Sequence, residues 1–358
     1  AAQVKFLDLT FTYDSLKDRI DAAVGEVLAS GLYLGGPHTR AFEAEFAAFC
    51  GSPHCIGLSN GLDALYAILR ALEVGPGDEV IVPAHTFVAT WLAVGRTGAT
   101  LVPVDADPET MNWDTAAVAR AIGPRTRVVM PVHLYGQMVD MAALRELLRG
   151  SDIALVEDAA QAHGATRDGL VAGAAGTAAG FSFYPGKNLG AFGDAGAVCT
   201  AEADLAERVR MVCNYGSVRK YDHAIEGVNA RLDEVQAAVL RVKLEALEAW
   251  TERRREIAEA YLSGLSDLPG IVLPGVDAGR AGHVWHLFVL RAGDRDALRA
   301  RLEELCVPTL IHYPVPPHRS GAYAGDFADA RFPVAEEICG SCLSLPIGPH
   351  LGDGEVDR

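Results

Sequence analysis

The chain has 358 residues, of which 50% are hydrophobic, and its formal net charge at pH 7 is −16. A chain of this length can bury a large core, and its size alone predicts two domains. The acidic balance, with no segment dense in Lys and Arg, argues against binding nucleic acid through its phosphates. No apolar run reaches the roughly 18 to 20 residues of a membrane span, and the first residues, AAQVKFLDLTF, lack the layout of a secretory signal, so we expect a soluble cytoplasmic protein.

The chain contains seven cysteines, an odd number that does not indicate a disulfide framework. The one C-x-x-C, from Cys339 to Cys342, has no second pair and no histidine cluster close to it in the sequence. We interpret these residues as ordinary buried thiols rather than as a zinc or redox site.

The first 72 residues alternate helical and strand patterns. Residues 14–30 carry apolar side chains at helical spacing and end before Gly31, and residues 39–51 form a second helical pattern. Residues 54–72 begin with a short apolar run, pass through a Ser-Asn-Gly turn and continue with helical spacing. We interpret this segment as strand, turn and helix.

The same alternation continues to about residue 160. The strand patterns are EVIVPA, TLVPVDAD, RVVMPVHLYG and IALVEDAA, and the helical patterns between them are TFVATWLAVGRTG, TAAVARAI and MAALRELLRG. Strands that are apolar on both faces and alternate with helices predict a mostly parallel sheet covered on both sides, and therefore an α/β fold.

The last third of the chain has a different character. A long helical pattern covers residues 232–262, and Pro-marked strands and one charged helix, RDALRARLEEL, follow it. We therefore predict a large α/β domain over residues 1–250 and a small α+β domain over residues 251–358. The last residues, LGDGEVDR, look like the opening turn of a further helix.

The stretch SFYPGKNLG places Lys187 in a turn rich in Gly and Pro between two apolar segments. An isolated lysine in such a turn is usually a surface residue. A lysine works as a covalent catalyst when burial or nearby positive charge promotes the loss of its proton, and the aromatic and apolar neighbours of Lys187 favour burial.

Three other features give Lys187 a chemical context. Asp158 follows a buried strand, at the edge of an open α/β sheet where ligands usually bind, although an acid there can also be a helix cap. The turn at residues 59–61 opens a helix and offers unpaired backbone amides to a phosphate, to which Ser182 adds a hydroxyl. A Schiff-base lysine, a carboxylate for a ring nitrogen and a phosphate cradle are together what pyridoxal 5′-phosphate (PLP) requires.

The chain resembles the DegT/StrS-like sugar-nucleotide aminotransferases in eight segments that follow one another in family order: FLDL, GLYLGGPHTRAFEAEFAAFCG, SNGLDAL, VPAHTFVAT, VEDAAQAHGA, FSFYPGKNLGAFGDAGAV, NARLDEVQAAVL and LSLPIGPH. The resemblance covers nearly the whole chain. It implies the PLP-dependent transferase fold type I, with a mostly parallel sheet of the seven-stranded type between helices. It also implies a homodimer whose active sites lie at the subunit interface.

The resemblance implies a role for each matching residue. Lys187 would hold the cofactor as a Schiff base and shuttle the proton, and Asp158 would partner the ring nitrogen. The other implied cofactor ligands are the backbone of Gly61 and Leu62, Phe87 stacked on the ring, Gln161 near the ring oxygen, Ser182 at the phosphate and Asn229 from the other subunit. Leu62 stands where many family members have threonine, so no side-chain hydroxyl is available there.

Three of these roles have plainer alternatives when the motif order is set aside. Phe87 would then be a core residue, Gln161 a residue of a helix turn, and Asn229 the N-cap of the helix that follows it.

The resemblance implies transamination of a nucleotide-linked keto-deoxysugar with L-glutamate as the amino donor. Some family members have histidine at the position of Lys187 and act as dehydratases, so a lysine there favours transamination. The segments PVHLYGQMVDM, YGSVRKYDHAIEGVNARLDE and TLIHYPVPPHRSGAY look most like the enzymes that make 3-amino sugars from dTDP-3-keto-6-deoxyhexoses. We favour 3-amination, with 4-amination as the alternative.

Several polar and aromatic residues are candidates for contacts with the sugar or the nucleotide. They are Tyr33, His133, Tyr184, Arg219, Tyr221, His223, His312 and His318. A histidine among them can equally be a hydrogen-bonded interior group. Arg219, Lys220 or Arg231 would offset the charge of the diphosphate.

Rival functions lack their own sequence signals. A nicotinamide-dependent enzyme would carry G-x-G-x-x-G after its first strand, and this chain does not. A Schiff-base aldolase would need neither the phosphate turn nor Asp158 in this order. A non-catalytic PLP-binding regulator stays open, although no DNA-binding helix pair or basic region supports it.

Overall fold

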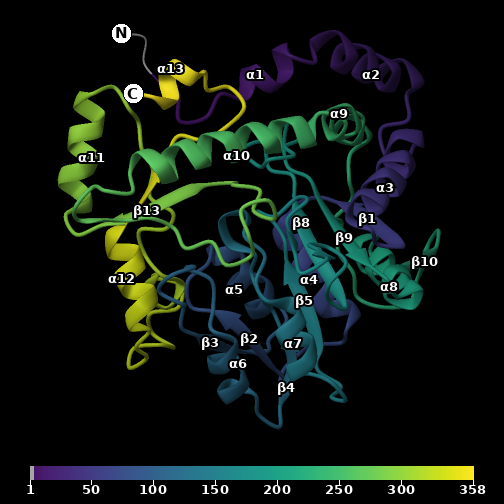
Figure 1. Ribbon diagram of the computed structural model, residues 1–358. Coiled ribbons are helices and arrows are strands. Elements are labelled where there is room, and N and C mark those ends of the chain that lie inside the picture. The colour runs from purple at the N-terminus through teal and green to yellow at the C-terminus, as the bar shows by residue number, and fades with distance from the viewer. Residues whose placement is uncertain (1–3) are drawn as a thin grey trace.

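The computed structural model describes residues 4–358. Its centre is a seven-stranded sheet with the strand order β1-β9-β8-β5-β4-β2-β3 (Figure 1). Only β9 runs antiparallel to its neighbours, β1 and β8, which confirms the prediction of a mostly parallel sheet. The strands are β1 His54–Leu58, β2 Glu79–Pro83, β3 Thr100–Val104, β4 Thr126–Val129, β5 Ala154–Asp158, β8 Ala178–Ser182 and β9 Gly196–Thr200.

Helices cover both faces of this sheet because successive strand residues point to opposite sides. Val80 belongs to the buried cluster under one set of helices, and Ile81 belongs to the cluster on the other face. The first set is α4 Gly61–Ala71, α5 Val88–Gly95 and α8 Ala203–Cys213. The other set is α3 Pro37–Cys50, α6 Thr115–Ala121, α7 Met141–Leu147 and α9 Glu234–Leu244.

One predicted helix begins later than expected, and another is divided. The pattern over residues 14–30 forms α2 (Lys17–Ser30), which the short helix α1 (Leu9–Asp14) precedes, and α2 ends at Gly31, whose φ of 69° suits glycine. The pattern over residues 232–262 forms α9 and α10 (Leu247–Gly264). The interruption lies where the amide of Ala246 bonds the carbonyl of Lys243, three residues back, in a tighter turn.

A second, antiparallel sheet lies in the last third of the chain and has the strand order β12-β13-β14. Its strands are β12 Ile271–Val272, β13 Phe288–Ala292 and β14 Cys342–Leu345, and its helices are α10, α11 Arg295–Glu304, α12 Pro333–Ser341 and α13 Asp353–Val356. A separate buried cluster that includes Ile257, Trp285, Phe288 and Leu343 fills its interior. All seven cysteines are free, and Cys339 and Cys342 are buried.

Short elements complete the fold. They are the 3-10 turns η1 Leu134–Gly136 and η2 Pro317–Arg319, and the hairpins β6 Thr166–Arg167 with β7 Leu170–Val171 and β10 Ser217–Arg219 with β11 Asp222–His223. The β10 end of the second hairpin lies at the periphery of the molecule, away from the central sheet (Figure 1). Within residues 4–358, no helix has both the length and the apolar character needed to cross a membrane.

Candidate active site

The predicted site residues meet at one edge of the central sheet because parallel strands end on the same side. β1 leads into Gly61, β2 into Phe87, β5 ends at Asp158, and β8 ends at Ser182. A cavity of about 690 Å³ lies there. Among the predicted residues, the cavity is lined by Gly61, Leu62, Phe87, Asp158, Gln161, Ser182, Tyr184, Lys187 and His312.

Lys187 lies in the loop that follows β8, and its amide donates a 2.8 Å hydrogen bond to the carbonyl of Tyr184. Burial lowers the pKa of Lys187 to about 8, although the negative charge of Asp158 acts in the opposite direction. A substantial fraction of this amine is therefore neutral near pH 8, which is the form that reacts with a carbonyl group.

Asp158 is buried at the end of β5 and accepts two hydrogen bonds. The hydroxyl of Thr90 donates at 2.8 Å, and the amide of Ala160 donates at 3.2 Å. Since the hydrogen of Thr90 points to Asp158, the hydroxyl of Thr86, 2.9 Å from Thr90, is the donor to Thr90. Burial raises the pKa of Asp158, and the hydrogen bond from Thr90 opposes that rise.

The candidate phosphate cradle lies where α4 begins beside β8. The side chain of Asn60 caps α4 by accepting the amide hydrogen of Asp63, which leaves the amides of Gly61 and Leu62 ahead of the first closed turn. A Cβ atom on Gly61 would lie 2.7 Å from the Cβ of Ser182, so glycine is needed for this approach. The hydroxyl of Ser182 and the helix N-terminus thus face the same cavity.

The opposite part of the cavity is built around Gln161. Its side-chain oxygen accepts from the amide of Tyr135 at 2.6 Å, and its Nε2 donates to the hydroxyl of Tyr313 at 3.0 Å. The ring of Tyr313 lies 5.4 Å from the ring of Phe87, centroid to centroid, and Phe87 is half exposed. Two aromatic rings therefore line the cavity, and one of them, Phe87, is the residue just before α5.

These residues fit PLP as a set. An amine, a buried carboxylate, a half-exposed aromatic ring and a phosphate cradle are the groups that such a cofactor needs, and all of them line one cavity. The glycine at 61 lets the N-terminus of α4 approach Ser182 without a side-chain clash.

The structure does not bring His133 and His318 to the cavity, contrary to the expectation from the sequence. Both side chains are completely buried. Nε2 of His133 lies 2.9 Å from Glu157, and Nε2 of His318 lies 2.9 Å from Glu336. Each histidine therefore satisfies a carboxylate within the fold.

Other predicted contacts lie on exposed segments outside this cavity. Asn229 forms an isolated bridge with Asn214, next to the β10–β11 hairpin. The remaining members are Tyr33, Arg219, Tyr221 and His223, and Tyr221 is 84% exposed. No residue of this group lines the 690 Å³ cavity.

The structure adds residues that the sequence reasoning missed. Thr90 was within the quoted VPAHTFVAT segment, one helical turn after Thr86, and that spacing was the available signal. Tyr313 adjoins His312, which binds Ser344 through Nδ1 at 2.8 Å. His286 also lines the cavity, and no sequence pattern pointed to it.

Comparisons with known proteins show which family the chain is similar to. The family model described as the DegT/DnrJ/EryC1/StrS aminotransferase family matches residues 14–358. The chain is 54% identical over 350 residues to the dTDP-3-amino-3,4,6-trideoxy-alpha-D-glucose transaminase of Streptomyces venezuelae, covering 98% of this chain and 92% of that protein.

Two solved structures extend the comparison. The crystal structure of DesV from S. venezuelae has a TM-score of 0.97 at 53% identity and covers 100% of this chain and 96% of that one. NtdA from Bacillus subtilis, with bound cofactor PMP, has a TM-score of 0.92 at 30% identity and covers 100% of this chain and 83% of that one.

Proposed function

Because the chain belongs to the DegT/DnrJ/EryC1/StrS aminotransferase family, we propose that it transfers the amino group of L-glutamate to C3 of a dTDP-linked 3-keto-6-deoxyhexose. It is a PLP-dependent aminotransferase. The 3-amino product in the name of the S. venezuelae relative supports the choice of carbon and of nucleotide.

One observation carries the proposal. Lys187, Asp158 and the pair Gly61 and Ser182 come from separate segments, and the fold places all of them on one cavity. A lysine with a pKa of about 8 supplies a nucleophile and a base near neutral pH. A structural lysine would need none of these neighbours.

Each residue at the cavity has a separate role in the proposed reaction. When bound, PLP supplies an aldehyde for the amino group and a ring that stabilises negative charge on the adjacent carbon. Lys187 attaches the cofactor and moves a proton through its Nζ atom. Asp158 supplies a buried negative charge for the ring nitrogen, and Thr90 orients that carboxylate. Gly61, Leu62 and Ser182 bind the phosphate.

The sugar end of the substrate has candidate partners in the same cavity. Tyr184 is exposed beside Lys187, and His312 lies on the other wall. Burial lowers the pKa of His312 to about 4, so the ring is neutral at pH 7. Because Nδ1 is bound to Ser344, Nε2 is the atom left to bond a sugar hydroxyl.

The active unit in this proposal is a homodimer. Asn229 and the β10–β11 hairpin lie outside the cavity of their own chain, and exposed apolar side chains surround them. Tyr33 belongs to this surface, because its carbonyl accepts the amide of Glu234 close to Asn229. The exposed members are Leu32, Tyr33, Leu34, Tyr215, Val218, Tyr221 and Ile225. Burying this surface against a second copy would let Asn229 bind the phosphate in the partner's cavity.

The first experiment follows visible absorbance. The purified protein with PLP should show a yellow band that borohydride removes, and mass spectrometry should then find a pyridoxyl group on Lys187. L-Glutamate should bleach the band in the unreduced protein. A protein that gains no band and no modified Lys187 would contradict the proposed function.

The second experiment identifies the carbon. The enzyme is incubated with L-glutamate and either a dTDP-3-keto or a dTDP-4-keto 6-deoxyhexose, and NMR locates the new amine in the product. Product from only the 4-keto sugar would favour the alternative substrate. Binding of PLP with no turnover of either sugar or of glutamate would favour a regulator.

Two expectations from the sequence stay predictions. One is the division into domains at residues 1–250 and 251–358, and the other is a cytoplasmic location.

A further inference from the structure

Residues 183–193, here called the lysine loop, form most of the connection between β8 and β9 and carry Lys187. The loop folds back on itself, because the amide of Ala191 donates to the carbonyl of Phe183 at 2.8 Å. A Cβ atom on Gly190 would lie 2.3 Å from the carbonyl oxygen of Pro185, so the backbone at Gly190 has no spare room. The position of Lys187 therefore depends on what anchors this compact loop.

Two side chains of α9 bind consecutive parts of the lysine loop. The side-chain oxygen of Gln236 accepts the amide hydrogen of Phe192 at 2.7 Å, and Nζ of Lys243 donates to the carbonyl of Gly190 at 2.5 Å. Gln236 and Lys243 are seven residues apart, which places them two turns apart on the same face of the helix. One rigid helix thus holds the loop at a backbone donor and at a backbone acceptor.

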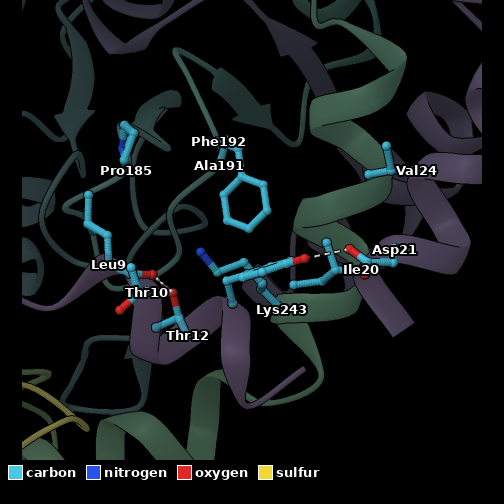
Figure 2. Close-up of a pocket in the computed structure, with 11 residues that line it drawn as sticks. Leu9, Thr10, Thr12, Ile20, Asp21, Val24, Pro185, Ala191, Phe192 and Lys243 are labelled. Atoms are coloured by element: carbon cyan, nitrogen blue, oxygen red, sulfur yellow. Dashed lines mark hydrogen bonds between the residues drawn. The ribbon is translucent and has the colours of Figure 1, made fainter. Parts of the chain in front are cut away.

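Lys243 is an unusual residue for this position because it is only 3% exposed. Its ammonium nitrogen lies 5.1 Å from the centre of the Phe192 ring, and it has no carboxylate partner within residues 4–358. Figure 2 shows its side chain extending beside that ring, in a groove of about 530 Å³ between α1, α2 and the loop. Burial lowers the pKa of Lys243 to about 8, which reflects the unfavourable burial of its charge.

Lys243 also lies behind the reactive lysine. Lys187, Asn188 and Lys243 are among the residues that line a second, small hollow beside the loop. The amides of α9 are used within the helix, so only a long side chain with a terminal donor can reach the carbonyl of Gly190 from there. An apolar residue at 243 would leave that carbonyl without its hydrogen bond.

We propose that Lys243 is a positioning residue for transamination: with Gln236, it anchors the lysine loop to α9 and so fixes Lys187 toward the cavity. This inference rests on the proposed role of Lys187. The anchoring itself is a property of the protein without cofactor, so it can be measured apart from any reaction.

The test compares Lys243→Met with Lys17→Met by hydrogen exchange in the cofactor-free protein. Lys17 lies on α2 beside the same groove and bonds only Tyr13 and Asp21, so it is a matched lysine removed from the loop. We expect Lys243→Met to speed exchange at the amides of Ala191 and Phe192 about tenfold, corresponding to the loss of one hydrogen bond. Exchange equal to that of Lys17→Met would overturn the proposal.

Two further measurements separate positioning from general stability. In the cofactor-free protein, the rate at which Lys187 is acetylated should differ between Lys243→Met and the wild type. In the enzyme, kcat of Lys243→Met should fall with little change in KM. Lys243→Arg should restore part of the acetylation rate and part of kcat. If Lys243→Met does not fold, Gln236→Leu removes the other anchor and should give the same faster exchange. If Lys243→Met exchanges faster but the wild-type protein aminates no sugar, the anchoring role of Lys243 is supported and the proposed function is contradicted. If exchange is unchanged and the wild-type enzyme is active, only the anchoring role is contradicted.

Discussion

The hydroxyl of Thr90 donates a 2.8 Å hydrogen bond to the carboxylate of Asp158, and both side chains are buried, with Asp158 lining the cavity. The bond joins the first turns of α5 to the end of β5. Because burial raises the pKa of Asp158 and this bond lowers it, Thr90 favours the charged form that the ring nitrogen requires.

Replacing Thr90 with valine keeps the shape and removes the donor. The pKa of Asp158 should rise further, so the loss of kcat on the acid side should begin at a higher pH. We expect kcat at neutral pH to fall roughly tenfold, since hydrogen bonds to charged groups contribute about 1.5–3 kcal/mol. Thr90→Ser keeps the hydroxyl and is the control, and identical pH profiles for both variants would contradict the role of Thr90.

The lowered pKa of Lys187 predicts that its amine reacts with acylating reagents at a lower pH than an ordinary lysine does. Its neutral amine should appear with a midpoint near pH 8 in the cofactor-free protein, far below the ordinary lysine value of 10.5. Mass spectrometry of the peptide labelled with acetic anhydride measures this midpoint. An acylation midpoint above pH 10 would contradict a buried lysine. Lys187→Arg should lower kcat at least 10³-fold, because the base and the nucleophile are lost together.

Glu234 on α9 joins that helix to the start of α3, and we predict that Glu234→Gln destabilises the protein. Its carboxylate accepts the amides of Gly36, His38 and Thr39 and the hydroxyl of Thr39. Burial raises its pKa, but these donors outweigh burial and lower it overall. We expect a loss of about 2–4 kcal/mol in the free energy of unfolding.

The sign of the pH effect follows from the lowered pKa of Glu234. Its stabilisation is present above the ordinary value and is lost as pH falls through the folded-state pKa. The difference between wild type and Glu234→Gln should therefore shrink on acidification in urea titrations. A difference that does not depend on pH would point to packing instead.

Substitutions at Gly36 and Gly25 test the contact between Glu234 and the start of α3. A Cβ atom on Gly36 would lie 2.5 Å from Oε1 of Glu234, whereas one on Gly25 in α2 meets nothing within 4 Å. Gly36→Ala should lower the melting temperature, and Gly25→Ala should raise it slightly because alanine favours a helix by up to about 1 kcal/mol. Equal melting temperatures would show that Glu234 moves aside freely.

Replacing His133 should affect stability, whereas replacing His312 should affect the KM for the sugar. His133→Phe leaves buried Glu157 without one partner, so we expect a loss of about 1–3 kcal/mol in stability with an unchanged KM for the sugar. His312→Phe should raise the KM for the sugar and change stability less. Urea titration and steady-state kinetics of both variants distinguish a core residue from a substrate contact.

The homodimer with shared sites predicts complementation. Asn229→Ala and Lys187→Ala should each be nearly inactive alone. Mixed after reversible dissociation, they should form heterodimers that regain about a quarter of the wild-type rate per subunit pair by random pairing, since half of the dimers are mixed and each has one intact site. No recovery, with mixed dimers shown by mass spectrometry, would place Asn229 in its own chain's site.

The sequence by itself determined the sheet and the residues at its edge. Apolar runs such as EVIVP and ALVED fix strands buried on both faces, and the residue after or at the end of each run must lie where parallel strands terminate. This is why the sequence could group Gly61, Phe87, Asp158, Ser182 and Lys187, and in the structure all five line one cavity. Local spacing suffices here because the strands that lead to these residues, β1, β2, β5 and β8, run in the same direction.

Only the tertiary structure decided which polar side chains reach the cavity. His133 and His312 look alike in the sequence, yet the first pairs with Glu157 in the core and the second lines the cavity. Lys243 became visible as an anchor only when α9 was packed behind the lysine loop, 53 residues from Gly190. Hydrogen-bond partners between distant segments depend on packing geometry, and no local pattern of residues encodes them.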